Sequence, residues 1–199
     1  MLGTKEMMSQ VFDAEGRAVP VTIVRAEPLV VLGTRTRERD GYEAVQVGAG
    51  KKRAIARPQQ GFFTSLGRLR HVREFHTKEQ GAWRRGEQIS VSVFSEGDIV
   101  EARGEVKGRG FQGVVKRHGF HGGSRTHGQK HSEREPGSIG ATAPQKVLKG
   151  KRMAGRMGGN TICVKNVRVI KVDASRNLLA ISGALPGSRG TLLRIIAQT

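Results

Sequence analysis

The chain has 199 residues, with 35 Lys and Arg against 17 Asp and Glu, and its formal net charge is +18 at pH 7. This charge indicates an anionic partner, and nucleic acid is favoured over a membrane surface because glycines break up the basic regions where an amphipathic helix would be needed. No run of eighteen apolar residues and no signal peptide is found, so we expect no membrane partner and a soluble, cytoplasmic protein.

Residues 1–50 are expected to form short strands separated by turns. A predicted turn at 13–16 precedes a strand at 19–24, and further strands are predicted at 29–32 and 42–47. Short strands at close spacing are typical of a β-barrel or a sandwich.

Residues 51–88 differ in composition from the segment before them. Basic residues surround a predicted short helix at 59–66, which begins just after Pro58. We interpret this region as a small inserted α+β subdomain. Residues 89–94 alternate again as a strand, and a strand at 99–103 leads into the next segment.

Residues 104–160 contain twelve Lys and Arg against three Glu, a local net charge of +9, and fourteen glycines. Few aliphatic or aromatic residues are present, so this segment cannot build a core of its own. Ordering its backbone costs about 1–2 kcal/mol per residue, and the free energy of binding to a polyanion could offset this cost. The composition therefore predicts an extended basic loop that threads into folded RNA, and a disordered basic loop is the alternative.

The predicted RNA contacts are basic and imidazole side chains of this loop, which would meet phosphate and ribose. They are Lys107, Arg109, Lys116, Arg117, His118, Arg125, His127, Lys130, Arg134, Lys146, Lys149, Lys151, Arg152 and Arg156.

The end of the chain returns to strand patterns, at 161–164, 167–172, 178–181 and 191–196. The simplest architecture is mainly β: one antiparallel β-barrel built from both ends of the chain, with the insert and the long loop. The expected division is barrel at 1–50, subdomain at 51–88, barrel strands at 89–103, basic loop at 104–160 and barrel again at 161–199.

Two chemical alternatives, a dinucleotide site and a metal site, are weak. The run GRGFQG at 108–113 matches a dinucleotide-binding fingerprint, but the βαβ context and the later acidic residue are missing. Four histidines at 118, 121, 127 and 131 lack thiols and helical spacing, so no metal is expected. Cys163 is expected to be a small buried residue in a strand. We predict no catalytic residues, no cofactor and no small-molecule substrate.

Three motifs follow one another in the sequence: GRGFQGVVKR at 108–117, PGSIG at 136–140 and KGKRMAGRMG at 149–158. In this order they resemble the universal large-subunit ribosomal protein L-three family, bacterial type, and weaker similarity extends over nearly the whole chain.

The resemblance implies a translation-protein-type barrel seated on the large ribosomal subunit. It implies direct binding of large-subunit rRNA, a role in subunit assembly, contacts with neighbouring ribosomal proteins, and a loop directed toward the peptidyl transferase centre. The competing readings are a dinucleotide-dependent enzyme using residues 108–113 and a general architectural nucleic-acid-binding protein.

Overall fold

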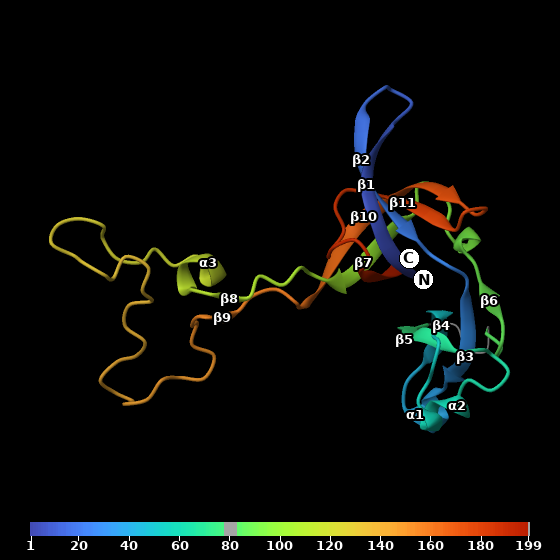
Figure 1. Ribbon diagram of the computed structural model, residues 1–199, viewed down its shortest axis with the longest axis horizontal. Helices are drawn as coiled ribbons and strands as arrows, with labels where there is room; N and C mark the ends of the chain where they lie inside the picture. Colours follow the sequence, from blue (N-terminus) through green and yellow to red (C-terminus); the bar gives the residue numbers. More distant parts are fainter. Residues whose placement is uncertain (78–82, 199) are drawn as a thin grey trace. The chain divides into compact units, whose positions relative to one another are not determined.

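The computed structural model describes residues 1–77 and 83–198. Residues 78–82, which belong to the predicted 51–88 subdomain, and residue 199 lie outside the described residues. The described chain is mainly β with few helical residues, as predicted (Figure 1). The strands are β1 (Leu2–Phe12), β2 (Ala18–Arg25), β3 (Leu29–Arg35), β4 (Ala44–Lys51), β5 (Leu69–His76), β6 (Gln88–Ile89), β7 (Ile99–Glu105), β8 (Phe111–Gln112), β9 (Gly155–Arg156), β10 (Thr161–Asp173), β11 (Leu178–Ser182) and β12 (Leu192–Ala197). The helices are α1 (Arg37–Asp40), α2 (Arg57–Gln60), α3 (Val114–His118) and the 3-10 helix η1 (Val91–Val93).

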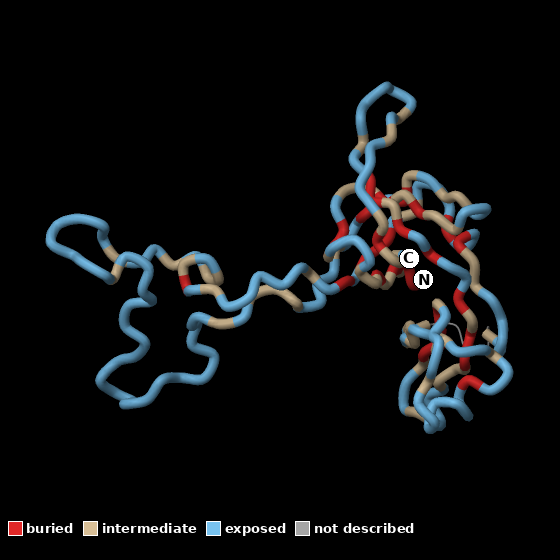
Figure 2. Tube along the Cα trace, viewed as in Figure 1, coloured by how far each residue is buried: buried red, intermediate tan, exposed pale blue. Residues whose placement is uncertain are grey.

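The chain divides into two units, and each is described by itself. The body consists of Met1–Glu105 together with Ile162–Thr199, and the basic unit is Val106–Thr161. Buried residues concentrate in the body, whereas most residues of the basic unit are exposed (Figure 2).

Six strands of the body close into a barrel in the order β1-β12-β7-β10-β11-β2. Alternating residues of each strand point inward, as a two-residue period requires. Leu193 and Ile195 of β12 and Leu179 and Ile181 of β11 are fully buried in this way. Gly104 of β7 permits the close packing, because a Cβ there would lie 2.5 Å from Cδ2 of Leu193.

A second sheet in the body has the strand order β5-β4-β3-β6. Its apolar side chains, among them Leu29, Val31 and Val47, form a second core cluster that also includes Leu2 of β1. Strand β5 was not predicted, because its basic residues concealed the strand pattern.

Two local predictions for the body were wrong. The predicted helix at 59–66 is reduced to α2 at Arg57–Gln60, and Ser65 has a positive φ of 68°, which a helix does not allow. The predicted strand at 89–94 is β6 followed by η1. There the three-residue spacing buries Val91 and Phe94 in the barrel core, which alternation cannot do.

The C-terminal part of the body also departs from prediction at two points. The segments 161–164 and 167–172 form one continuous strand, β10, within which Asn166 adopts a left-handed φ of 56° that asparagine tolerates. Cys163 lies in this strand, but it is exposed rather than buried. The buried residues of β10 begin only at Val167, so Cys163 precedes the part of the strand that lines the core.

Candidate nucleic-acid interface

The basic unit begins and ends in a two-stranded antiparallel ribbon, formed by residues 106–112 and 155–160. Backbone hydrogen bonds hold it together: the Val106 N–H donates to the Asn160 carbonyl at 3.0 Å, and the Met157 N–H donates to the Gly110 carbonyl at 2.9 Å. Strands β8 and β9 continue the pairing. The ribbon is thus held by main-chain bonds and needs no core.

Gly158 sets the geometry of the ribbon. Its φ is 75°, and a Cβ at this position would overlap the carbonyl oxygen of Lys107 on the opposite strand. Only glycine satisfies both the left-handed backbone and the close approach.

The short helix α3 follows the ribbon and is attached to the returning chain. Nη1 of Arg117 donates to the Met153 carbonyl at 2.6 Å, and Nε2 of His118 lies 3.0 Å from the same oxygen. A side chain at Gly155 would lie 2.9 Å from Nη1 of Arg117, so the glycine leaves room for the guanidinium. Val114 of α3 is the one buried residue of the basic unit, all of which the structure describes.

The loop between residues 120 and 152 is ordered by few contacts. The Gly123 N–H donates to the Glu133 carbonyl at 3.1 Å, and the Ser124 N–H donates to Oε1 of Gln129 at 2.9 Å. Across this turn the ion pair between Arg125 and Glu133 spans 3.8 Å and is solvent-exposed, so it contributes little stability.

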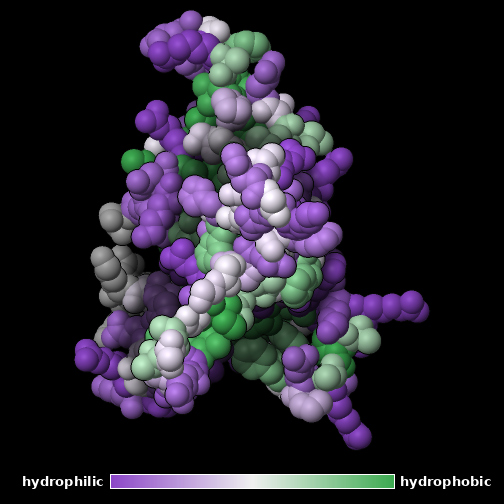
Figure 3. Space-filling view, turned by 90° about the vertical axis from the view of Figure 1, so that its left-hand side faces the viewer, coloured by the Kyte–Doolittle hydropathy of each residue, from purple (hydrophilic) through white to green (hydrophobic). Residues whose placement is uncertain are grey.

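Twelve of the fourteen predicted RNA-contacting side chains are exposed, and Arg117 and His118 are half-buried. The structure thus places most of the predicted set in solvent, while these two also bind the Met153 carbonyl within the protein. Between described residues, Arg125–Glu133 is the one ion pair that involves the basic unit. Among the residues that the structure describes, the other cations of the unit have no carboxylate partner. On the face shown in Figure 3, hydrophilic side chains cover most of the surface.

The described histidines and the glycine-rich run at 108–113 do not have the geometry of a metal site or of a dinucleotide site. In the described part of the chain, no three His, Cys, Asp or Glu side chains gather in a way that could hold a metal ion. Residues 108–112 lie in the antiparallel ribbon, and Gly113 leads into a helix of only five residues. A dinucleotide fold needs parallel strands joined by a longer helix.

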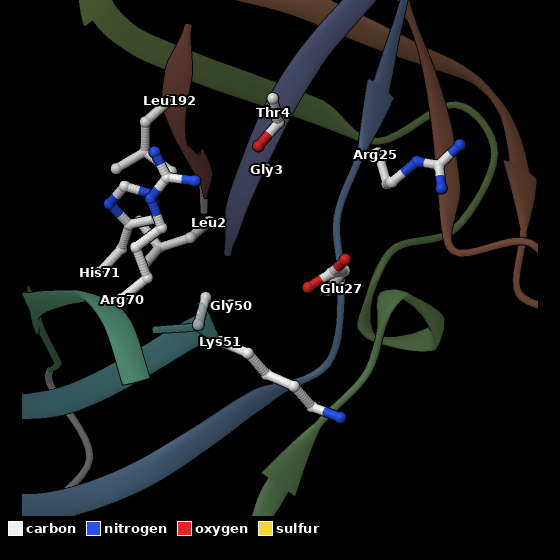
Figure 4. A pocket seen from close by; sticks show the side chains of 11 residues that line it. Leu2, Gly3, Thr4, Arg25, Glu27, Gly50, Lys51, Arg70, His71 and Leu192 are labelled. Carbon is white, nitrogen blue, oxygen red and sulfur yellow. The ribbon is translucent and has the colours of Figure 1, made fainter. Parts of the chain in front are cut away.

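A second group of basic side chains was missed by the sequence analysis. Arg25, Lys51, Arg70 and His71 line a pocket of the body together with Glu27, where the barrel meets the second sheet (Figure 4). Burial, reinforced by the charges of Arg70 and Arg73, lowers the pKa of His71. These residues come from four separate strands and loops, so no local sequence pattern marks them. Arg25 is already paired with Glu6 at 2.6 Å.

None of the helices in the described residues is both long and apolar enough for a membrane span.

Comparison with known proteins gives one consistent answer. A family model described as Ribosomal protein L3 matches residues 74–190. Proteins named large ribosomal subunit protein uL3 are similar over 98% of this chain and 95% of their own length. Those from Roseiflexus sp., Nostoc punctiforme and Lysinibacillus sphaericus are 50%, 46% and 43% identical to it, respectively.

Proposed function

This chain belongs to the ribosomal protein L3 family, and from that membership we propose that it is a structural constituent of the large ribosomal subunit that binds the large-subunit rRNA directly. One observation carries the mode of binding: a glycine-rich unit exposes twelve of the fourteen predicted RNA-contacting side chains, and between described residues it forms a single ion pair. The protein works in the cytoplasm as part of the subunit, and its further partners are neighbouring ribosomal proteins.

Binding follows from electrostatics and backbone access. Exposed Lys and Arg side chains neutralise phosphates and release condensed counterions, which gives an affinity that falls steeply with salt. Because the basic unit buries only Val114, contacts with RNA must offset the entropy lost when its loop becomes ordered. The ribbon and α3 are held by internal hydrogen bonds and present the loop to the RNA.

The finer features of the family resemblance belong to the same proposal. The barrel is of the translation-protein type, and its strands are β1, β2, β7, β10, β11 and β12. Strands β3 and β4 belong with residues 51–88 to an inserted subdomain, and residues 104–160 form the basic loop. The loop runs toward the peptidyl transferase centre, and the protein supports subunit assembly. The chain contributes no catalytic step of its own and takes no cofactor.

The two competing functions have less support. The ribbon geometry of residues 108–113 does not favour a dinucleotide-dependent enzyme. A general architectural nucleic-acid-binding protein would show no preference for ribosomal RNA, so the same binding experiment separates it.

The test is equilibrium binding of the full-length chain to transcripts of large-subunit rRNA domains, between about 50 and 200 mM salt. Random duplex DNA and an unrelated structured RNA of equal length are the competitors. We expect a preference for one or more rRNA domains at the higher salt. Equal affinity for all three ligands would overturn the proposal.

A matched pair of triple variants tests whether the basic unit is the interface. Lys149→Gln, Lys151→Gln and Arg152→Gln remove three exposed cations from the basic unit, and Lys51→Gln, Lys52→Gln and Arg53→Gln remove the same residue types, also exposed, from the body. The salt slope is the steepness with which the logarithm of the affinity falls as the logarithm of the salt concentration rises. The first set should lower this slope by about three, and the second by less. Equal losses would mean that diffuse net charge, rather than the basic unit, governs binding.

A further inference from the structure

The β1–β2 hairpin carries an exposed apolar surface in the otherwise cationic chain. Its two strands pair from Thr4–Arg25 out to Phe12–Ala18, and Figure 1 shows the hairpin continuing beyond the strands of the barrel. Met8 and Phe12 are 51% and 64% exposed. Residues this apolar on the surface of a small protein mark an interaction site when they gather on one face.

The register of the hairpin places these residues on one face. Side chains alternate between faces along a strand, so Met8, Gln10 and Phe12 share a face with their cross-strand partners Thr22, Pro20 and Ala18. The hairpin face is defined here by its exposed members, Met8, Gln10, Phe12, Ala18 and Pro20. Thr22, at its base, is buried and donates to the Gly183 carbonyl at 2.7 Å, so the face begins where the barrel ends.

The charges of the hairpin differ from those of the rest of the chain. Residues 6–25 contain the acids Glu6, Asp13 and Glu15 and the bases Arg17 and Arg25, a net charge of −1 in a chain of +18. Both arginines are already paired: Arg25 with Glu6 at 2.6 Å, and Arg17 with Asp13 at 2.9 Å and with Glu15 at 2.8 Å. Each cation of the hairpin thus already has a carboxylate partner, and the hairpin adds no net positive charge with which to attract a phosphate.

We propose that the hairpin face is a docking surface for a second protein of the large subunit, one whose own surface combines apolar side chains with a basic rim. The exposed Met and Phe supply apolar area for such a contact, and the net negative charge complements a basic partner. Pro20 lacks an N–H, which disfavours strand addition at this position of β2, so the partner packs on the face. This inference rests on the proposed function, because it takes the partner from the ribosomal particle.

An isolated two-stranded hairpin is marginally stable in water. In Figure 3 the hairpin is uppermost and shows hydrophobic residues beside hydrophilic ones. A protein packed on the face would cover these hydrophobic residues and stabilise the end of the hairpin that lies beyond the barrel.

The test is photo-crosslinking in assembled particles, with p-benzoylphenylalanine replacing Phe12 in the full-length chain expressed in cells. Phe111, which is 76% exposed in the basic unit, is the matched control position. Cosedimentation of the tagged chain with large subunits is read first, because its absence counts against the proposed function alone. The molecule crosslinked at each position is then identified by nuclease treatment and mass spectrometry.

We expect position 12 to crosslink one basic protein of the large subunit and position 111 to crosslink rRNA. Position 12 crosslinked to rRNA or to a second copy of this chain would overturn the inference, as would no product there while position 111 reacts. A protein product at position 111 would count against RNA binding by the basic unit and leave the docking surface intact.

A second variant keeps the inference testable if the crosslinker disturbs folding. Met8→Ser with Phe12→Ser changes two exposed side chains, so the thermal midpoint and the rRNA affinity should stay as in the parent chain. Quantitative mass spectrometry of purified subunits should show one basic protein reduced several-fold. An unchanged set of subunit proteins would overturn the docking surface.

Discussion

Gly158 shows how one residue determines the geometry of the basic unit. Its positive φ and its contact with the Lys107 carbonyl both exclude a side chain. Gly108, on the facing strand, has no neighbour within 4 Å of a Cβ and no left-handed φ. The two glycines therefore have different roles although the sequence gives them the same appearance.

We expect Gly158→Ala to break the ribbon pairing, at a local cost of about 1–3 kcal/mol, and to weaken rRNA binding several-fold. Limited proteolysis should cut residues 106–160 faster, while the thermal midpoint of the body stays unchanged. Gly108→Ala is the control and should behave as the parent chain. Equal proteolysis of the two variants would contradict this account.

The α-amino group of Met1 predicts a pH dependence of stability. Burial, with a contribution from the Arg194 charge, lowers the pKa of this amine to about 5 from 8.0, and the amine donates to the Ile195 carbonyl at 2.6 Å. Between these values the unfolded chain binds one more proton than the folded chain, so stability rises with pH. The folding equilibrium constant should increase up to tenfold per pH unit between about 5 and 8.

Denaturant unfolding of the parent and of an N-terminally acetylated chain, compared at several pH values, measures this effect. The difference between the two slopes isolates the amine from the histidines. Parallel stability curves would show that the amine titrates alike in the folded and the unfolded chain.

At the scale of elements, α3 depends on contacts with the returning strand rather than on its own length. A five-residue helix is not stable alone, and here Arg117 and His118 bind the Met153 carbonyl, 36 and 35 residues away along the chain. The neighbouring Lys116 is exposed. The helix therefore positions two cations differently: one toward the protein and one toward solvent.

Arg117→Gln should release the segment around Met153, seen as faster amide hydrogen exchange in residues 153–157. Lys116→Gln should leave that exchange unchanged and only lower the salt slope of RNA binding by about one. If both variants changed exchange equally, the bond from Arg117 would not hold α3 in place.

At the scale of the whole molecule, the hydrophobic cores belong to the body. Apart from Val114, every buried hydrophobic residue found in the described chain lies in residues 1–105 or 162–199. The ribbon brings the ends of the basic unit together, since Val106 N–H and the Asn160 carbonyl are 3.0 Å apart. The body should therefore fold without most of the basic unit.

We expect a chain in which a two-residue Asn-Gly turn replaces residues 108–158 to keep the thermal midpoint of the parent within a few degrees. Its rRNA affinity should fall by orders of magnitude, because most phosphate contacts are lost. Circular dichroism and the binding assay measure the two effects. Failure of this shortened chain to fold would show that the basic unit stabilises the body.

The sequence by itself determined the features that composition and local pattern express directly. The excess of Lys, Arg and Gly in 104–160 located the basic segment, turn residues such as Asp13 and Gly16 marked the hairpin, and three ordered motifs indicated the family, which the comparisons confirm. Charge, turn chemistry and motif order are properties of neighbouring residues, so they can be read without a fold.

Only the tertiary structure decided which residues act together across the chain. In the folded chain, Arg117 and His118 contact the Met153 carbonyl, and Arg70 and Lys51 line one pocket. Val91 is buried in a 3-10 helix where the alternating pattern predicted a strand. The tertiary structure also left Met8 and Phe12 exposed on one face of the hairpin. Each of these outcomes depends on strand register and on contacts between distant segments. The free energy of those contacts outweighs local propensity, and it cannot be inferred from the pattern of neighbouring residues in the sequence.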